Sequence, residues 1–444
     1  MSMKRRKKES QADLWIAAGQ VVCGPGNPFY KRLNTILAKK GFDAYVEELC
    51  EAFYAAGQGR PSIAPGVYFR MLLIGYMEGL DSERGIAWRC ADSLGLREFL
   101  GYPLTTATPD HSSLSVIRRR LDLATHGKVF TWVLQVLTEE GLLKGKTIGV
   151  DATTLEANAA LRSIVRRDTG EGYNEFLTKL AQASGIEHPQ REDLAKLDRN
   201  RPKKGSNTEW EHPHDPEARI TKMKDGRTHL AHKAEHAVDM ETGAVVAVTM
   251  QGADQGDTQT LMDTLAQVAE NLNALPLKAQ PLQEVVGDKG YHCNESARAL
   301  AELGVRSYLS EPDRGRRQWS GKGTEQKAVY ANRRRIRGAR GKRLLRRRGE
   351  LVERPFAHCY ETGAMRRTHL RGQENILKRV LVHVAGCNLG LLMRRSFGFG
   401  TPRGLSALWA PLLSLLFRLR DVAQRLWQPI CRPQNVSPSI LAAA

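Results

Sequence analysis

Three carboxylates stand at places in the sequence where chemistry could be done. Asp151 ends the apolar run of "IGVDATT", and Asp288 ends the apolar run of "VVGDKGYH". Glu353 lies much further along, in "ELVERPFAHCYETG". Carboxylate oxygens are ligands for hard divalent cations such as Mg²⁺. Asp and Gly also favour ordinary turns, so Asp288 taken alone suits a turn as well as a metal site. Only a fold could bring these three residues together.

The elements expected after residue 144 would place two of these carboxylates at strand ends. Residues 146–158 open with a strand, and residues 229–252 alternate as two strands around "METG", which predicts a hairpin. The other expected elements are a helix at 257–275, a strand at 284–290, a helix at 295–304, a strand at 305–310 and a long helical stretch from about 350 to 395. This order predicts a mixed α/β fold in which one sheet is flanked by helices.

The rest of the chain divides by composition. Residues 1–12 are expected to be a disordered basic tail, and residues 13–143 an all-helical N-terminal domain. Residues 144–395 would form the domain that carries the carboxylates. Residues 396–444 would be a C-terminal apolar and basic tail, either an oligomerisation helix or a loosely ordered segment. Inside the carboxylate-bearing domain, residues 160–228 are polar with little apolar periodicity, which indicates an insertion or a long flexible loop.

The charge of the chain points to a polyanionic partner. Its 67 Lys and Arg residues exceed its 48 Asp and Glu residues, for a net charge of +19. Nucleic acid explains this excess most simply, with an anionic membrane surface as the alternative. The most apolar stretch, 405–417, is too short to span a membrane, and the N-terminus lacks the apolar core of a signal peptide. The seven scattered cysteines include no CxxC pair, which fits reduced thiols in a cytosol.

Basic residues cluster where they could contact DNA phosphates. The basic segment 311–349 contains "RRRIRGARGKRLLRRRG", with ten Arg or Lys residues. Such a block of like charge should extend unless a polyanion neutralises it. Arginines after "PDHSS" make the helical N-terminal region a candidate DNA-binding domain, although a helical bundle with a solvated basic face is also consistent. Lys289 could contact phosphate or be a solvated turn residue. The candidate DNA contacts are Arg118, Arg119, Arg120, Lys289, Arg333, Arg334, Arg335, Arg346, Arg347, Arg348, Arg366, Arg367 and Arg371.

Five blocks of the sequence resemble the DDE transposases of bacterial insertion sequences, in the insertion-sequence 4/5 superfamily and most similar to its 1182-type group. The ordered set, spread between about residues 100 and 390, is more specific than any single block. The blocks are "PDHSSLSVIRRRL" (109–121), "IGVDATTLEAN" (148–158), "HKAEHAVDMETGAVVAVTMQGADQGDTQTL" (232–261), "VVGDKGYH" (285–292) and "VERPFAHCYETGAMRRTHLRG" (352–372). The resemblance implies a ribonuclease H-like catalytic core, with Asp151, Asp288 and Glu353 as its first, second and third acidic residues.

The resemblance also implies an activity. Such a transposase binds terminal inverted repeats, hydrolyses phosphodiester bonds at the element ends and transfers the 3′-hydroxyl ends to target DNA. The three carboxylates would hold two Mg²⁺ or Mn²⁺ ions, which stabilise charge on the attacking and leaving oxygens. A homodimer on double-stranded DNA is expected, in the bacterial cytoplasm at the nucleoid, without a membrane partner. Two alternatives stay open: an inactive protein that still binds the inverted repeats, and a two-metal DNA nuclease unrelated to transposition.

The third acidic residue departs from the family pattern. Many relatives show the signature Tyr-x2-Arg-x3-Glu-x6-Lys around it. For Glu353 the Arg and Lys positions hold Gly349 and Tyr360, and for Glu350 they hold Arg346 and Ala357. Glu353 is preferred because "VERPFAH" matches the family better. Glu350 stays the alternative, since two residues three positions apart on a helix lie on one face.

Overall fold

The structure is a computed structural model that describes residues 26–404, apart from 56–61, 202–204, 224, 278–281, 314 and 316. The expected tail at 1–12 and nearly all of the expected tail at 396–444 therefore lie outside the described residues. The described cysteines, Cys50, Cys90, Cys293, Cys359 and Cys387, are all free thiols.

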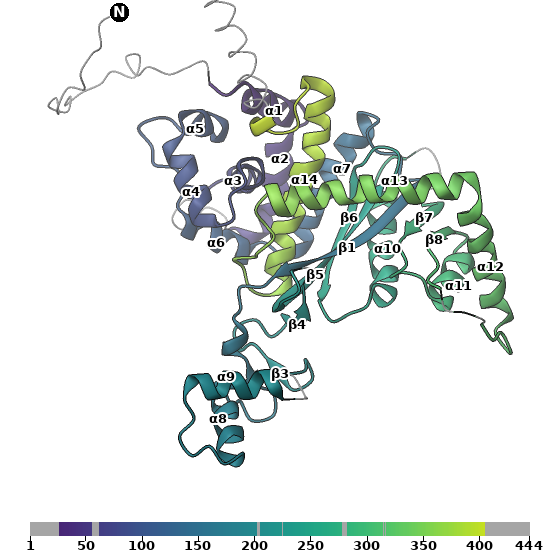
Figure 1. The fold of residues 1–444 in the computed structure, drawn as a ribbon. Helices are drawn as coiled ribbons and strands as arrows, with labels where there is room; N and C mark the ends of the chain where they lie inside the picture. The colour runs from purple at the N-terminus through teal and green to yellow at the C-terminus, as the bar shows by residue number, and fades with distance from the viewer. Residues whose placement is uncertain are drawn as a thin grey trace, which may run out of the picture.

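A six-stranded mixed sheet forms the centre of the molecule (Figure 1). Its strands are β1 (Thr147–Glu156), β4 (Arg219–Lys222), β5 (Thr228–Asp239), β6 (Val245–Gly252), β7 (Glu284–Gly287) and β8 (Arg306–Leu309). The order is β4-β5-β1-β7-β8, and β6 also pairs with β5. β5 runs antiparallel to β1, whereas β7 is parallel to both β1 and β8. The mixed α/β prediction is confirmed, and the order agrees with a ribonuclease H-like core.

Helices cover both faces of this sheet. Successive side chains of a strand point to opposite faces, and two neighbours on β5 identify what covers each face. The Glu235 carboxylate accepts a hydrogen bond from Thr260 of α10 (Asp257–Asn273), whereas the His236 ring packs on Phe356 of α13 (Ala339–Phe356). α10 and α13 therefore lie on opposite faces. α11 (Asn294–Glu302) connects β7 to β8, and α12 (Gly323–Arg337) leads from β8 to α13.

The N-terminal part of the described chain is helical, as predicted. Its helices begin at residues that can cap them: the Asp110 carboxylate accepts from Ser112 N–H at the start of α6, and Asp122 accepts from Thr125 N–H at the start of α7. The helices are α1 (Pro28–Lys39), α2 (Phe42–Cys50), α3 (Pro65–Glu78), α4 (Glu83–Asp92), α5 (Leu94–Leu100), α6 (His111–Arg120) and α7 (Leu123–Glu139).

A long C-terminal helix, α14 (Gln373–Phe397), joins the helical region to the sheet. It packs against α3 and α7 on one side and against β6 on the other. The buried side chains of both regions form one contiguous apolar cluster. α14 is long and apolar enough to cross a membrane, but 89% of its most apolar window is buried inside the protein. Its composition is therefore explained by its place in the core.

Residues 160–228 form a folded insertion, so the alternative of a long flexible loop is wrong. Its elements β2 (Val165–Arg166), α8 (Tyr173–Ala183), α9 (Arg191–Asn200) and β3 (Trp210–Glu211) project away from the sheet, whereas β4 of the same range pairs with β5 in the central sheet (Figure 1). A small apolar cluster joins it to the ends of β1 and β5: Ile164, Trp210 and Ala218 of the insertion pack with Ala157 and Leu230. So small a core leaves little periodicity in the sequence.

The basic segment 311–349 is largely helical and not extended, which corrects the expectation from its charge. Most of it is helical in α12 and α13. α13 buries Leu344, Leu351, Val352 and Phe356, while its arginines point away from this apolar stripe or lie at its edges. The late helical stretch also begins earlier than predicted, and a π-helical turn at Ala357–Thr362 separates α13 from the loop before α14.

Candidate active site

The sheet brings Asp151 and Asp288 side by side. β1 and β7 are parallel neighbours in which Thr147 pairs with Glu284 and Gly149 pairs with Val286. Asp288 directly follows β7, beside β1, and Asp151 lies on the face covered by α13, where Arg348 binds it. Burial raises the pKa of Asp151 above its usual value, and the nearby charge of Asp288 raises it further. Two carboxylates therefore meet at one edge of a rigid sheet.

Asp151 is held by two partners. Its Oδ1 accepts from Ala152 N–H at 2.9 Å, and its Oδ2 lies 3.0 Å from Nη1 of Arg348 on α13. Only 20% of the Asp151 side chain and 14% of the Arg348 side chain are exposed. The Arg348 guanidinium lowers the pKa of Asp151 and so opposes the effect of burial. Arg348 was predicted to contact DNA, but here it supplies the positive charge next to Asp151.

The turn after β7 fixes Asp288 and brings in another carboxylate. Asp288 Oδ1 accepts from Gly290 N–H at 2.8 Å. A Cβ on Gly290 would stand 2.3 Å from Asp257 Oδ2 and 3.1 Å from Asp288 Oδ1, so the two carboxylates lie close together around this glycine. Sequence analysis did not place Asp257 here, because a residue at a helix start reads as ordinary N-terminal charge.

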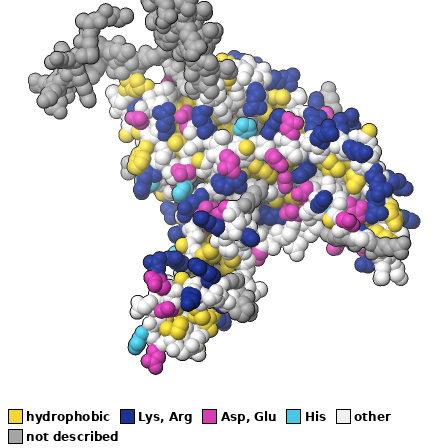
Figure 2. Space-filling model, viewed as in Figure 1, with side chains coloured by type: hydrophobic (Ala, Val, Ile, Leu, Met, Phe, Trp, Pro, Cys, Tyr) yellow, Lys and Arg dark blue, Asp and Glu magenta, His cyan; other side chains and the backbone are white. Residues whose placement is uncertain are grey.

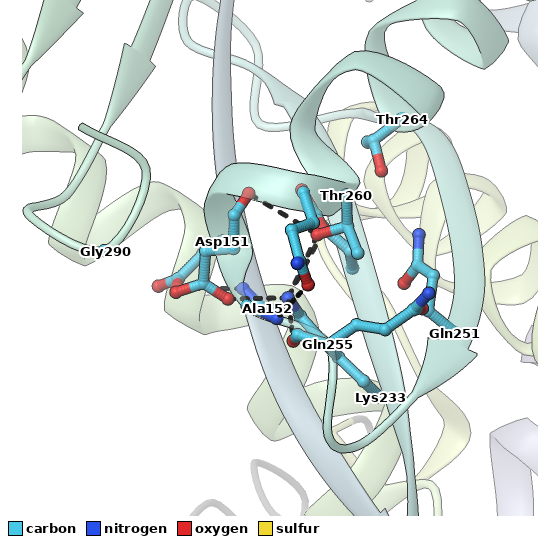
Figure 3. A network of polar contacts seen from close by, with 12 residues as sticks. Asp151, Ala152, Lys233, Gln251, Gln255, Thr260, Thr264 and Gly290 are labelled. Carbon is cyan, nitrogen blue, oxygen red and sulfur yellow. Dashed lines mark hydrogen bonds and ion pairs between the residues drawn. The ribbon is translucent and has the colours of Figure 1, made fainter. Parts of the chain in front are cut away.

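A buried polar network lies under this turn, on the α10 face of the sheet (Figure 3). Lys233 Nζ is 2.6 Å from Asp257 Oδ1 and donates to Thr260 Oγ1 at 3.0 Å. Thr260 Oγ1 donates to Glu235 Oε2 at 2.6 Å. Burial raises the pKa of Glu235 to about 7, while the bond from Thr260 and the charge of Lys233 act in the opposite direction. Burial, with Glu235 and then Asp257, also raises the pKa of Tyr291.

Glu353 is not gathered with the two aspartates. It lies on α13 between Val352, which is buried against Gly149, and Phe356, which is buried on His236, but its own side chain is exposed. Glu350 is exposed as well and pairs with Arg354 of the same helix. Among the described residues, no three His, Cys, Asp or Glu side chains are grouped so that they could hold a metal ion. Asp151 and Asp288 have the donor chemistry for such an ion, whereas the third predicted ligand does not reach them in this arrangement.

Several arginines that were predicted to contact DNA instead bind other residues of the protein. Arg118 forms an ion pair with Glu83, and each side chain is only 13% exposed. Arg335 donates to the carbonyl oxygen and the hydroxyl of Ser307. Arg333 pairs with Glu311, and Arg366 pairs with Glu361 and donates to Thr153 Oγ1 and Thr154 O. These arginines have structural partners that DNA phosphates would have to replace.

The other predicted DNA contacts lie at the surface. Arg120 stacks over the Tyr54 ring, and Arg367 lies 3.7 Å from Glu156. Figure 2 shows Lys and Arg side chains along α13 and over the projecting insertion. The exposed members of the predicted set are Arg119, Arg120, Lys289, Arg334, Arg346, Arg347, Arg367 and Arg371.

Two family models match the chain. The model described as Transposase domain (DUF772) matches residues 23–120, which cover α1 to α6. The model described as Transposase DDE domain matches residues 207–389, a range that includes Asp288 and Glu353. Asp151 lies between the two matched ranges. No curated protein matches the sequence.

Proposed function

The chain belongs to the DDE transposases of insertion sequences, and we propose that it binds the terminal inverted repeats of its element, hydrolyses phosphodiester bonds at the element ends and joins the freed 3′-hydroxyls to target DNA. The two family matches confirm the predicted family, and the 1182-type group stays a prediction. The enzyme would act in the bacterial cytoplasm on nucleoid DNA. Because two element ends must be processed together, a homodimer on DNA is part of the proposal.

One observation carries the catalytic part of the proposal: Asp151 in the middle of β1 and Asp288 directly after β7 lie on neighbouring parallel strands, close enough for the charge of Asp288 to act on Asp151. DDE transposases generally use divalent metals, and the proposal assigns two Mg²⁺ or Mn²⁺ ions to this site. When bound, such ions polarise the attacking oxygen and support the leaving oxygen of an in-line displacement. Asp151 and Asp288 would supply carboxylate oxygens for them.

The protein's own residues prepare the site for a polyanion. Arg348 balances the charge of Asp151 through their ion pair. Gly290 N–H fixes the orientation of Asp288. Glu353 is proposed as the third acid on the motif match, supported by the path of α13, which crosses the face of the sheet that carries Asp151. A change in the side chain or in the rotation of α13 would have to bring Glu353 inward.

The DNA would follow the exposed arginines of α13 and of the loop before α14. Phosphate contacts by these residues make binding steeply dependent on salt, because each one releases condensed counterions. The helical N-terminal region is proposed to bind the inverted repeats, since it carries the match to the DUF772 transposase domain and the exposed Arg119 and Arg120.

The experiment that tests this function is cleavage of a duplex that contains the element end, with Mg²⁺ or Mn²⁺. We expect cleavage by the wild type, loss of cleavage in Asp288→Ala with DNA binding retained, and wild-type cleavage in Asp263→Ala, whose side chain is exposed on α10. Full activity of Asp288→Ala would overturn the site assignment. Glu353→Gln and Glu350→Gln identify the third acid, and we expect only the former to abolish cleavage.

Two further outcomes distinguish the alternatives. Binding of the inverted repeats without cleavage under either metal would identify an inactive DNA-binding protein. Cleavage without joining of a pre-cut 3′ end to a second duplex would identify a nuclease. We expect joining, because the chain belongs to the transposase family.

A further inference from the structure

We propose that Lys233 and Asp257 are positioning residues for the active site: their ion pair, supported by Glu235 and Thr260, holds the turn at 288–290 and thereby sets the affinity of the Asp151–Asp288 pair for divalent cations. The proposal rests on the proposed function only in taking Asp288 as a metal ligand. One chain of neighbouring side chains leads from the interior of the protein to the Asp288 carboxylate.

Lys233 is the buried end of this chain. It lies on β5 opposite Thr154 of β1, and its side chain is only 6% exposed. Its ammonium group lies 2.6 Å from Asp257 Oδ1, donates to Thr260 Oγ1 at 3.0 Å and to Gln255 O at 3.3 Å. An ammonium group has three protons to donate, and these three partners match that number. Lys233 therefore ties the first turn of α10 to the centre of the sheet.

Asp257 lies between Lys233 and the turn that carries Asp288. One of its oxygens is bound to Lys233, and the other, Oδ2, is 2.3 Å from the point where a Cβ of Gly290 would stand. Gly290 in turn donates its N–H to Asp288 Oδ1. The space beside Gly290 that a side chain would fill is therefore occupied by the Asp257 carboxylate, so the proposal takes the position of Asp257 to limit the positions open to the turn.

Glu235 and Tyr291 are the remaining members of the network on this face of the sheet. Glu235 lies on β5 opposite Ala152 of β1, next to the residue that pairs with Asp151, and Thr260 donates to its Oε2. Tyr291 directly follows Gly290 and is fully buried, so the chain that leaves the turn is anchored on the same face of the sheet. Figure 3 shows the network with Asp151 and Gly290 on one side and Thr264 on the other.

Stability alone is a poor explanation for this ion pair. A buried ion pair contributes little to folding compared with apolar side chains of the same volume, because both charges lose their hydration. What the pair does provide is a fixed geometry between α10, β5 and the turn. Groups that orient metal ligands commonly change metal affinity by about 10–100-fold when they are removed.

The direction in which cation affinity changes when Lys233 loses its charge distinguishes a positioning role from a purely electrostatic one. Removing the positive charge of Lys233 makes the surroundings of the site more negative, so a purely electrostatic role predicts tighter binding of a cation. Loss of positioning predicts weaker binding. Lys233→Met, which keeps the length of the side chain but removes the charge, therefore gives opposite results under the two explanations.

The test measures binding of Mn²⁺ to the full-length protein without DNA, by electron paramagnetic resonance and calorimetry. We expect Lys233→Met and Asp257→Asn each to weaken binding by about tenfold or more, and the double variant to be little worse than either single variant, since both act through one contact. The matched control is Thr264→Val, one helical turn further along α10, which removes the buried hydroxyl pair with Thr249. Its Mn²⁺ affinity should stay within about twofold of the wild type's.

Unchanged or tighter Mn²⁺ binding in Lys233→Met would overturn the proposal, as would an equal loss in Thr264→Val, which would indicate general damage to α10. Asp257→Asn keeps the proposal testable should Lys233→Met fail to fold, because the Asp257 side chain is one-third exposed and the change is nearly isosteric. Mn²⁺ binding that persists in Asp288→Ala would instead contradict the site of the proposed function. The two failures are therefore distinguishable without any cleavage assay.

Discussion

Gly290 is a position where a single methyl group should disturb the chemistry. A Cβ there would stand 2.3 Å from Asp257 Oδ2 and 3.1 Å from Asp288 Oδ1, so at least one carboxylate has to move. We expect Gly290→Ala to lower the rate of cleavage by about tenfold or more, with the protein still folded, because the residue is exposed. Single-turnover cleavage and circular dichroism check this.

A matched control for that substitution is Gly127→Ala in α7. Nothing lies within 4 Å of its added Cβ. Since alanine is favoured over glycine inside helices by about 0.5–1 kcal/mol, this variant should be slightly more stable and fully active. Normal cleavage by Gly290→Ala would show that the turn tolerates displacement of its carboxylates.

Glu235 should make the stability of the protein depend on pH. Burial raises its pKa in the folded state from 4.5 to about 7, so the folded protein favours the protonated form. Its contribution is complete below pH 4.5 and is lost as the pH rises through about 7, with an upper bound of about 3 kcal/mol. Urea unfolding at pH 5, 6, 7 and 8 should show the free energy of unfolding of the wild type falling relative to that of Glu235→Gln. A constant difference between the two would contradict the shift.

At the scale of the element, α13 carries two arginines in different environments, and we expect them to act differently. Arg346 is exposed, whereas Arg348 is bound to Asp151. We expect Arg346→Gln to reduce the salt slope of DNA binding by about one unit while cleavage of bound DNA continues. Arg348→Gln should leave the slope unchanged and lower cleavage. DNA-binding isotherms measured from low to high salt, together with cleavage rates of DNA-saturated complexes, distinguish the two variants. A reduced salt slope in Arg348→Gln, with normal cleavage, would instead show that Arg348 contacts the DNA.

The same element shows how far sequence analysis could reach. Alternation and turn signals predicted the hairpin of β5 and β6, because strand periodicity is a local property. The nearness of Asp151 and Asp288 followed from the motif match, whereas the predicted strand end at Asp151 is wrong, because β1 continues to Glu156 along its pairing with β5. The rotation of α13 about its axis could not be predicted, because the few apolar residues of this Arg-rich helix do not reveal which side faces the sheet until the sheet is known. Asp257 was missed for a similar reason, since its approach to Gly290 depends on tertiary packing.

At the scale of the molecule, Asn388 adds polar bonds to the apolar packing of α14 on the sheet. The Asn388 amide accepts from Val245 N–H at 2.9 Å and donates to Val245 O at 2.8 Å, with no exposed surface. We expect Asn388→Ala to reduce the free energy of unfolding by about 2–3 kcal/mol, because both backbone groups of Val245 lose a buried partner. Urea unfolding measures this. The exposed Asn273→Ala is the control and should change stability by less than about 0.5 kcal/mol.

The position of α14 also has a consequence for how the protein is made. The helices α3 and α7 leave the ribosome early, but the helix that covers their apolar faces is among the last parts of the described chain to be synthesised. At about 5–20 residues per second, the early helices wait on the order of tens of seconds before they can complete their packing. A chain cut short before α14 would therefore leave the apolar faces of α3 and α7 uncovered, and its helical N-terminal region would not complete its packing.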